Sequence, residues 1–130
     1  MTMRSATPLL IMMAALAGCG GSAVRTASQL PPATVTGEPV SCVLLQNIRE
    51  TKVRDDSTID FIMRNGKVYR NTLPNSCPQL GFERSFTYAT SISQLCSVDV
   101  ITVLQQGGGL RRGASCGLGQ FTPIERPARK

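Results

Sequence analysis

The cysteines are the feature that most constrains how this chain of 130 residues can fold. Cys19 lies near the start of the sequence, and the other four cysteines follow at Cys42, Cys77, Cys96 and Cys116. No two of them form a close Cys-x-x-Cys pair, so the spacing disfavours a zinc site built from four thiolates. Their role depends on the compartment, because disulfides persist only in an oxidising environment.

The first residues have the pattern of an export signal. Arg4 provides a charged start, and an apolar run follows from Pro8 to Ala17. The run is about ten residues long, whereas a helix that spans a bilayer needs roughly 20, so it is typical of a cleaved signal peptide. The segment Leu16-Ala17-Gly18-Cys19 resembles the lipobox of bacterial lipoprotein precursors. That resemblance implies that residues 1–18 are removed and that Cys19 becomes the lipidated first residue.

A lipidated Cys19 predicts a protein that is tethered to a membrane without spanning it. A thioether-linked diacylglycerol and an acylated amino group together supply several chains, and two or more chains anchor a protein stably. By analogy with lipoprotein sorting in Gram-negative cells, Gly20 in place of Asp favours the outer membrane, with the domain facing the periplasm. The alternative is an ordinary secretory signal followed by a chance cysteine.

The composition divides the rest of the chain. Residues 20–40 are rich in Gly, Ser, Thr, Ala and Pro and show no hydrophobic period, as expected of a flexible tether. The predicted organisation is therefore a signal peptide (1–18), a lipidated cysteine with its tether (19–40), a folded domain (41–125) and a basic tail (126–130).

The folded part needs cross-links because it is small. A domain of about 85 residues buries only about 60 to 65% of its unfolded surface. Once Cys19 is assigned to lipid, the other four cysteines form an even set, and two disulfides follow. Of the three possible connectivities we favour Cys42 with Cys116 and Cys77 with Cys96, which would tie the first strand to the last.

Alternating apolar residues predict an all-β fold with little helix. Ile59, Phe61 and Met63 alternate with polar residues before Asn65-Gly66, and an extended pattern resumes at Val68. Asn-Gly suits a two-residue type I′ turn, which would place Met63 opposite Val68, Phe61 opposite Arg70 and Ile62 opposite Tyr69. Both faces of this hairpin carry apolar residues, so we expect both to be covered.

Further strands are predicted at 43–53, 84–89, 98–104 and 115–121, which makes about six strands. A single helical turn is expected between Ser91 and Gln94, and a mobile glycine-rich loop between Gln105 and Gly113. The fold that fits is a small antiparallel β barrel or sandwich.

An ordered set of short motifs resembles a family of small proteobacterial envelope proteins, numbered 6491 among the domains of unknown function. The motifs are Cys42, Asp56-x-Thr58-Ile59-x-Phe61, Tyr69-Arg70-Asn71-x-Leu73, Cys77-Pro78-x-Leu80, Phe86 to Tyr88, Leu95-Cys96, Asp99-x-Ile101-x-Val103 and Cys116-x-Leu118-Gly119-x-Phe121. They cover nearly the whole folded part. The resemblance implies one structural unit around the four cysteines and brings no catalytic residues with it.

The composition argues against most enzyme classes. The chain has no His and no Trp, which removes imidazole-based nucleophiles, zinc ligands and proton shuttles. Asp55, Asp56, Asp60 and Asp99 offer oxygen ligands for Ca²⁺ or a pair of acid and base groups. Turn formation explains Asp55 and Asp56 better, and no EF-hand spacing is present. We therefore expect a protein with no catalytic residues, no metal site and no cofactor.

The charge points to anionic neighbours. The formal net charge is +6, with 14 Lys and Arg against 8 Asp and Glu. Arg111 and Arg112 in the glycine-rich loop are candidate anion contacts, although such a loop is more often a simple hairpin connection. In an envelope the partner would be a lipid headgroup or another anionic component, not nucleic acid. Phe86 and Tyr88 could stack on a ligand, but alternating aromatic residues in a strand are more often core.

These residues leave three functions open. The first is a non-enzymatic binding or structural module of the envelope. The second is a periplasmic inhibitor of a hydrolase, although the basic loop at 107–113 disfavours a cationic target. The third is a small enzyme that uses Asp60 or Asp99 as its acid or base.

Overall fold

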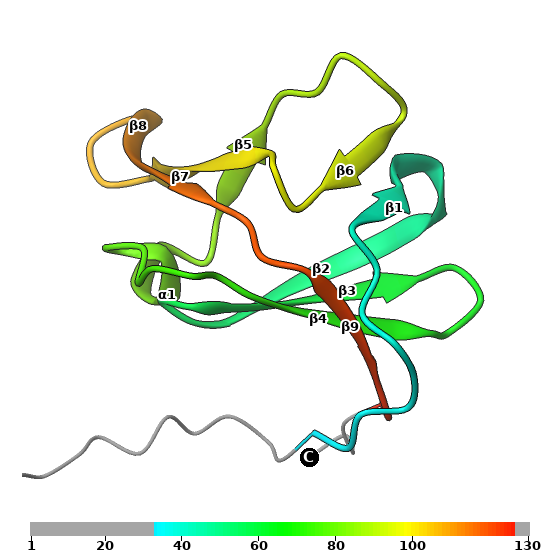
Figure 1. Ribbon diagram of the computed structural model, residues 1–130. Helices are drawn as coiled ribbons and strands as arrows, with labels where there is room; N and C mark the ends of the chain where they lie inside the picture. Colours follow the sequence, from blue (N-terminus) through cyan, green and yellow to red (C-terminus); the bar gives the residue numbers. More distant parts are fainter. Residues whose placement is uncertain (1–32, 127–130) are drawn as a thin grey trace, which may run out of the picture.

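The computed structural model describes residues 33–126, and within them nine strands form three antiparallel sheets with little helix (Figure 1). The four-stranded sheet has the order β2 (Ile48–Asp55), β3 (Thr58–Met63), β4 (Val68–Thr72) and β9 (Phe121–Ile124). The three-stranded sheet has the order β5 (Phe86–Tyr88), β7 (Val100–Gln105) and β8 (Arg111–Gly117), and β1 (Cys42–Leu44) pairs with β6 (Gln94–Cys96). The short helices are η1 (Leu45–Asn47) and α1 (Leu80–Glu83). The predicted all-β class with two disulfides is confirmed, as a sandwich and not a closed barrel.

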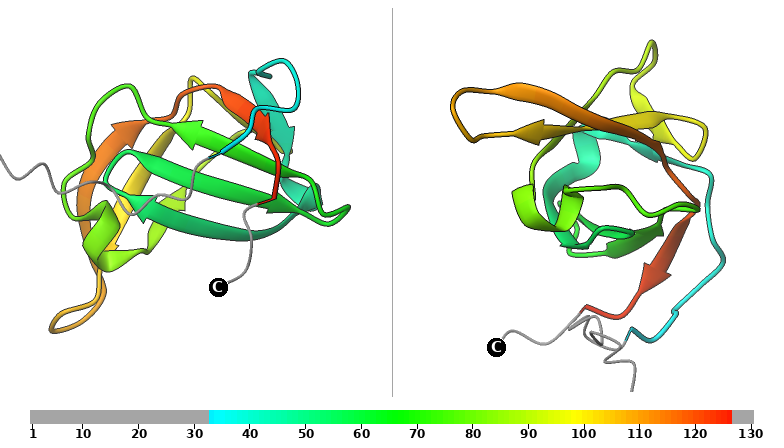
Figure 2. Two further views of the ribbon diagram at one scale, coloured as in Figure 1. Left: turned by 90° about the horizontal axis from the view of Figure 1, so that it is seen from below. Right: turned by 90° about the vertical axis from the view of Figure 1, so that its left-hand side faces the viewer.

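The core lies between the four-stranded sheet and the two smaller sheets, which face it from the other side (Figures 1 and 2). Phe61 is its centre, since its ring meets Phe121 edge-on at 5.2 Å and Phe86 at 6.5 Å between centroids. Phe86 therefore packs against the core, while Tyr88 lies at the surface. On the opposite face of β3, Ile62 packs with Val68 and Ile124 in a second cluster, so both faces of the hairpin are covered as expected.

The β3–β4 hairpin forms as predicted, but its turn and register differ. The backbone N–H of Met63 donates to the oxygen of Lys67, which leaves a three-residue loop. Gly66 alone takes the left-handed conformation, with φ of 86°, as in a type I turn followed by a bulge. The register is therefore shifted by one residue, and Arg70 lies opposite Asp60 instead of Phe61. A shift of one residue exchanges the faces of a strand, so this correction decides which side chains meet.

Several other boundaries also differ from those predicted. The strand expected at 43–53 is divided into β1 and β2 by η1, and the one expected at 115–121 is divided between β8 and β9 in different sheets. The helical turn lies at Leu80–Glu83, whereas Ser91 is in a bend that leads into β6. The glycine-rich loop is shorter than 105–113, because β8 begins at Arg111. In each case strand pairing in the folded chain, which local periodicity does not report, sets the boundary.

The domain begins before Ser41. Residues 33–40, which we call the strap, run along the free edge of β9. Val40 exchanges two backbone hydrogen bonds with Phe121, and Thr36 donates to Pro123. The strap therefore protects an edge strand, and the eight residues before Ser41 belong to the domain and not to the tether. Residues 19–32 and 127–130 of the predicted tether and tail lie outside the described residues.

All four cysteines after Cys19 form disulfides, but the favoured pairing is wrong. Cys42 is bonded to Cys96, directly across the β1–β6 pair, and Cys77 is bonded to Cys116. The pairing follows from the topology, since β1 lies beside β6 and not beside β8. The sequence separations of 54 and 39 residues correspond to about 4 kcal/mol of loop entropy for each bond in the chain-entropy model.

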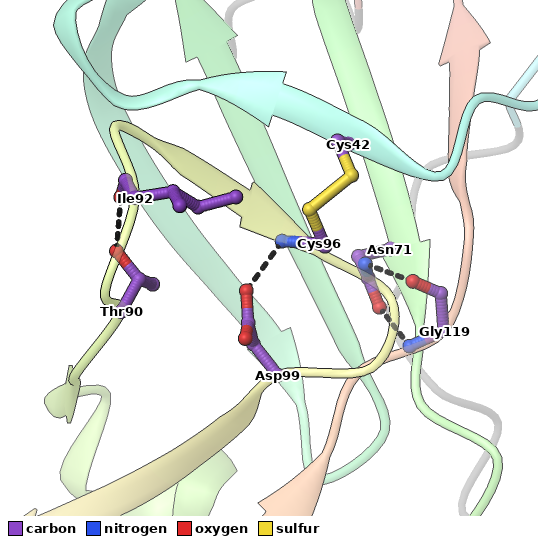
Figure 3. The surroundings of a disulfide bond; sticks show 7 residues. All are labelled: Cys42, Asn71, Thr90, Ile92, Cys96, Asp99 and Gly119. Carbon is purple, nitrogen blue, oxygen red and sulfur yellow. Dashed lines mark hydrogen bonds between the residues drawn. A yellow bond between two sulfur atoms is a disulfide. The ribbon is translucent and has the colours of Figure 1, made fainter.

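Two polar clamps lie near the first disulfide (Figure 3). The buried side chain of Asn71 on β4 donates to the oxygen of Gly119 at 2.7 Å and accepts from its N–H at 2.8 Å. Asp99 accepts a hydrogen bond from the backbone N–H of Cys96 at 2.7 Å. The first clamp joins β4 to the segment between β8 and β9, and the second fixes the turn between β6 and β7.

The disulfide pairing can be tested by peptide mapping. Trypsin places the four cysteines on separate peptides, 26–49, 71–84, 85–111 and 113–129. After digestion with blocked thiols and no reductant, we expect 26–49 linked to 85–111 and 71–84 linked to 113–129. A link between 26–49 and 113–129 would restore the pairing expected from the sequence and would contradict the structure.

The Asn71–Gly119 clamp predicts a position-specific cost for a single methyl group. A Cβ at residue 119 would overlap the backbone oxygen of Thr72, whereas one at Gly117 meets no atom within 4 Å. Gly119→Ala should therefore lower the free energy of unfolding by about 2 kcal/mol or more. The matched Gly117→Ala variant should change it by less than about 0.5 kcal/mol. Urea denaturation of both variants makes the comparison, and equal stabilities would contradict the close approach of residue 119 to the backbone of Thr72.

Candidate functional site

The four aspartates that could have formed a metal or acid–base site are separated by the fold. Asp55 accepts from the N–H of Ser57 within the β2–β3 turn, and Asp56 accepts from the N–H of Gly81 at 2.7 Å, which holds the start of α1. Asp99 binds the backbone of Cys96. Among residues 33–126, no group of three or more His, Cys, Asp or Glu side chains is placed to hold a metal ion. The carboxylates of Asp55, Asp56 and Asp99 therefore accept hydrogen bonds from backbone N–H groups.

Asp60 has a different role, which the sequence did not reveal. Its side chain is fully buried and lies between two arginines of the neighbouring strands. It accepts from Arg54 Nε at 2.8 Å, from Arg70 Nε at 2.7 Å and from a second nitrogen of Arg70 at 2.9 Å. One carboxylate thus joins β2, β3 and β4. A buried carboxylate that accepts hydrogen bonds from two guanidinium groups on neighbouring strands is a structural cross-link.

The predicted anion contact at Arg111 and Arg112 is not a convergent site. Both residues belong to β8, where they pair with Gln105 and Leu104 of β7. Successive side chains of a strand point to opposite faces, so the two guanidinium groups diverge. A carboxylate also lies at this end of the molecule, because Glu83 accepts a hydrogen bond from the N–H of Gln106. Both arginines are exposed and free to contact a surface, but the fold does not bring them together.

The structure contains a pocket that the sequence reading missed. It has a volume of about 370 Å³ and lies between the tip of the β3–β4 hairpin, the end of the strap and the β1–η1 segment. Its floor is apolar, with Val43 and Met63 buried, and its rim carries Arg64, Lys67 and the amide of Asn65. A volume of this size is within the range of small-molecule sites.

The hairpin places the two cations of the pocket. Arg64 and Lys67 flank the Asn65-Gly66 turn, which is fixed by the bond from the N–H of Lys67 to Asn65 Oδ1 at 2.9 Å. Two basic residues beside an Asn-Gly turn are visible in the sequence. The facing wall of the pocket could not be predicted from the sequence. It is formed by Val40 and Leu44, which are brought to the pocket by the strap and by the β1–β6 pair.

The predicted lipidation site, Cys19, lies outside the described residues. Within residues 33–126, none of the helices has the length and apolar character required to cross a bilayer. No protein-family model matches this chain, and neither the curated proteins nor the solved structures include a match. The resemblance to family 6491 and the lipobox therefore stay predictions from the sequence.

The buried carboxylate allows a structural role to be separated from a catalytic one. Asp60→Asn removes the charge that neutralises Arg54 and Arg70, so it should lower the free energy of unfolding by about 3–5 kcal/mol. Glu50→Gln is the matched control, because Glu50 and Lys52 form an exposed pair at 3.9 Å, and it should cost less than about 0.5 kcal/mol. Thermal and urea denaturation measure both variants. An Asp60→Asn protein as stable as the wild type would contradict the cross-link.

Proposed function

We propose that this chain is a lipid-anchored protein of a bacterial cell envelope, in the outer membrane facing the periplasm, whose disulfide-bonded β domain is a non-enzymatic binding module. The observation that carries this proposal is the division of the cysteines. Cys42, Cys77, Cys96 and Cys116 are all in disulfides, as expected of an exported domain, and Cys19 stands alone after Leu16-Ala17-Gly18. One thiol is therefore left in the position where a lipobox places its acylated cysteine.

The carboxylates support a binding module over an enzyme. The enzyme alternative would use Asp60 or Asp99 as its acid or base, and each of these carboxylates has a structural partner in the fold. The pocket at the β3–β4 tip offers the cations and the apolar floor of a binding site. The function that best accounts for these features is recognition of an anionic envelope component by a small rigid scaffold.

The anchor is tested by substitution of Cys19. Cys19→Ser should move the protein from the membrane pellet to the soluble fraction in high salt, because several acyl chains are then missing. The control is Glu50→Gln, a substitution at an exposed residue, which should leave the protein with the membrane. The intact wild-type mass should exceed that of residues 19–130 by the acyl groups. A Cys19→Ser protein that still pellets with membranes, or a wild-type mass without acyl groups, would refute the anchor.

The binding role is tested by cross-linking in intact cells. A photo-reactive residue at Asn65, on the rim of the pocket, should capture an envelope component. The same residue at exposed Thr51 on β2 is the control, because it lies outside the pocket lining and should give no shared product. The same products from both positions would argue against a specific site.

A further inference from the structure

We infer that the pocket at the tip of the β3–β4 hairpin binds the phosphate-bearing headgroup of an anionic phospholipid and so sets the orientation of the domain on the membrane that anchors it. This inference rests on the proposed lipid anchor and adds to it the ligand class and the residues of the site. The residues that carry it are Arg64 and Lys67 on the rim and Val43 and Met63 on the floor.

Each of the two cations on the rim has a contact within the domain that restricts its position. Arg64 Nε donates to the backbone oxygen of Gln46 at 2.7 Å, which ties the hairpin tip to η1. Lys67 Nζ lies 5.7 Å from the centre of the Tyr69 ring, a cation–π distance. Since Arg64 and Lys67 stand on either side of one tight turn, both reach the same rim. Guanidinium and ammonium groups placed in this way suit a phosphate oxygen cluster.

The remaining lining fits the rest of a lipid better than it fits a free anion. No acidic side chain is among the described residues of the lining, so nothing there repels a phosphate. The floor of Val43 and Met63 would contact the carbon atoms of the headgroup substituent that enters the pocket beyond the phosphate. Val40 and Leu44 at the edge are partly exposed apolar residues that a lipid surface would cover.

The position of the pocket in the chain brings it close to the membrane. Residues 20–32 separate Cys19 from Ala33, and a chain of that length spans about 20 Å on average and about 45 Å when extended. The strap then leads directly from Ala33 to Val40 at the pocket edge. A domain on so short a connection samples the headgroup region at high effective concentration, so even weak headgroup binding would orient it.

Arg111 and Arg112 provide a rival surface with the same number of cations as the pocket rim. The β7–β8 tip lies at the opposite end of the molecule from the β3–β4 tip in Figure 1 and in the left view of Figure 2. That tip also carries two arginines and the exposed Leu110. The side chains of Arg111 and Arg112 diverge, whereas those of Arg64 and Lys67 line one pocket. Substituting Arg111 and Arg112 therefore removes the same charge without changing the pocket and provides a matched control.

The experiment uses the mature chain with Ser in place of Cys19, exported behind an ordinary secretory signal, so that binding is independent of acylation. The probes are vesicles of phosphatidylcholine, the same vesicles with about one third phosphatidylglycerol, and inorganic phosphate. We expect co-sedimentation with the anionic vesicles only. Arg64→Gln with Lys67→Gln should weaken it about tenfold or more, whereas Arg111→Gln with Arg112→Gln should change it less than about twofold. Unchanged melting temperatures establish that each variant is folded.

The outcomes separate the possible sources of binding. Binding retained by Arg64→Lys with Lys67→Arg, which keeps both charges, supports the site. Competition by inorganic phosphate at the concentration that saturates the site would identify a free-phosphate site and overturn the lipid assignment. If both glutamine variants lose vesicle binding equally, the binding depends on net charge alone and the pocket is not the site. If only the Arg111 and Arg112 variant loses binding, the site lies at the β7–β8 tip. If the domain does not bind anionic vesicles but the wild-type mass shows acyl groups on Cys19, this inference is wrong and the proposed anchor stands. If the wild-type mass shows no acyl groups, the proposed anchor itself is wrong.

Discussion

The Cys77–Cys116 disulfide joins two layers that share no hydrogen-bonded strand pair in the described chain. Cys77 follows the four-stranded sheet, and Cys116 lies on β8 of the three-stranded sheet. Side-chain packing around Phe61 also holds the layers together, but a domain of this size buries too little apolar surface to rely on packing alone. The second bond, between Cys42 and Cys96, secures the short two-stranded ribbon that completes the upper layer. The rest of the structure depends on this covalent closure of a small core.

The short motifs behind the family resemblance have structural positions in this fold. Phe61, Leu80 and Phe121 are buried in the core, and the polar members form clamps, as Asn71 does with Gly119. Asp60, Arg54 and Arg70 extend the same principle across three strands, with one buried carboxylate between two guanidinium groups. These residues specify which strands meet, because a polar group buried without its partner is costly. Function is then expected on the surface that these residues leave free, and the pocket at the β3–β4 tip is part of that surface.

The pocket illustrates how the scaffold creates a site from residues that have little in common in sequence. Its cations come from a hairpin turn, its floor from β1 and β3, and its outer wall from the strap. The strap belongs to the segment that leads toward the predicted anchor, so anchoring and recognition would be linked by the same stretch of chain. A module that is tethered near its ligand can function with modest affinity, which suits a shallow site of two cations.

The sequence alone determined the β class, the hairpin around Asn65-Gly66 and the presence of two disulfides, because alternation, turn chemistry and cysteine number are local properties. The tertiary structure decided the cysteine pairing, the register that sets Asp60 opposite Arg70, and the inclusion of the strap. Each of these depends on which strands become neighbours, and strands of similar pattern are interchangeable until they pack. The pocket could not be predicted from the sequence for the same reason. Arg64 and Val40 line one pocket only because the strap pairs with β9.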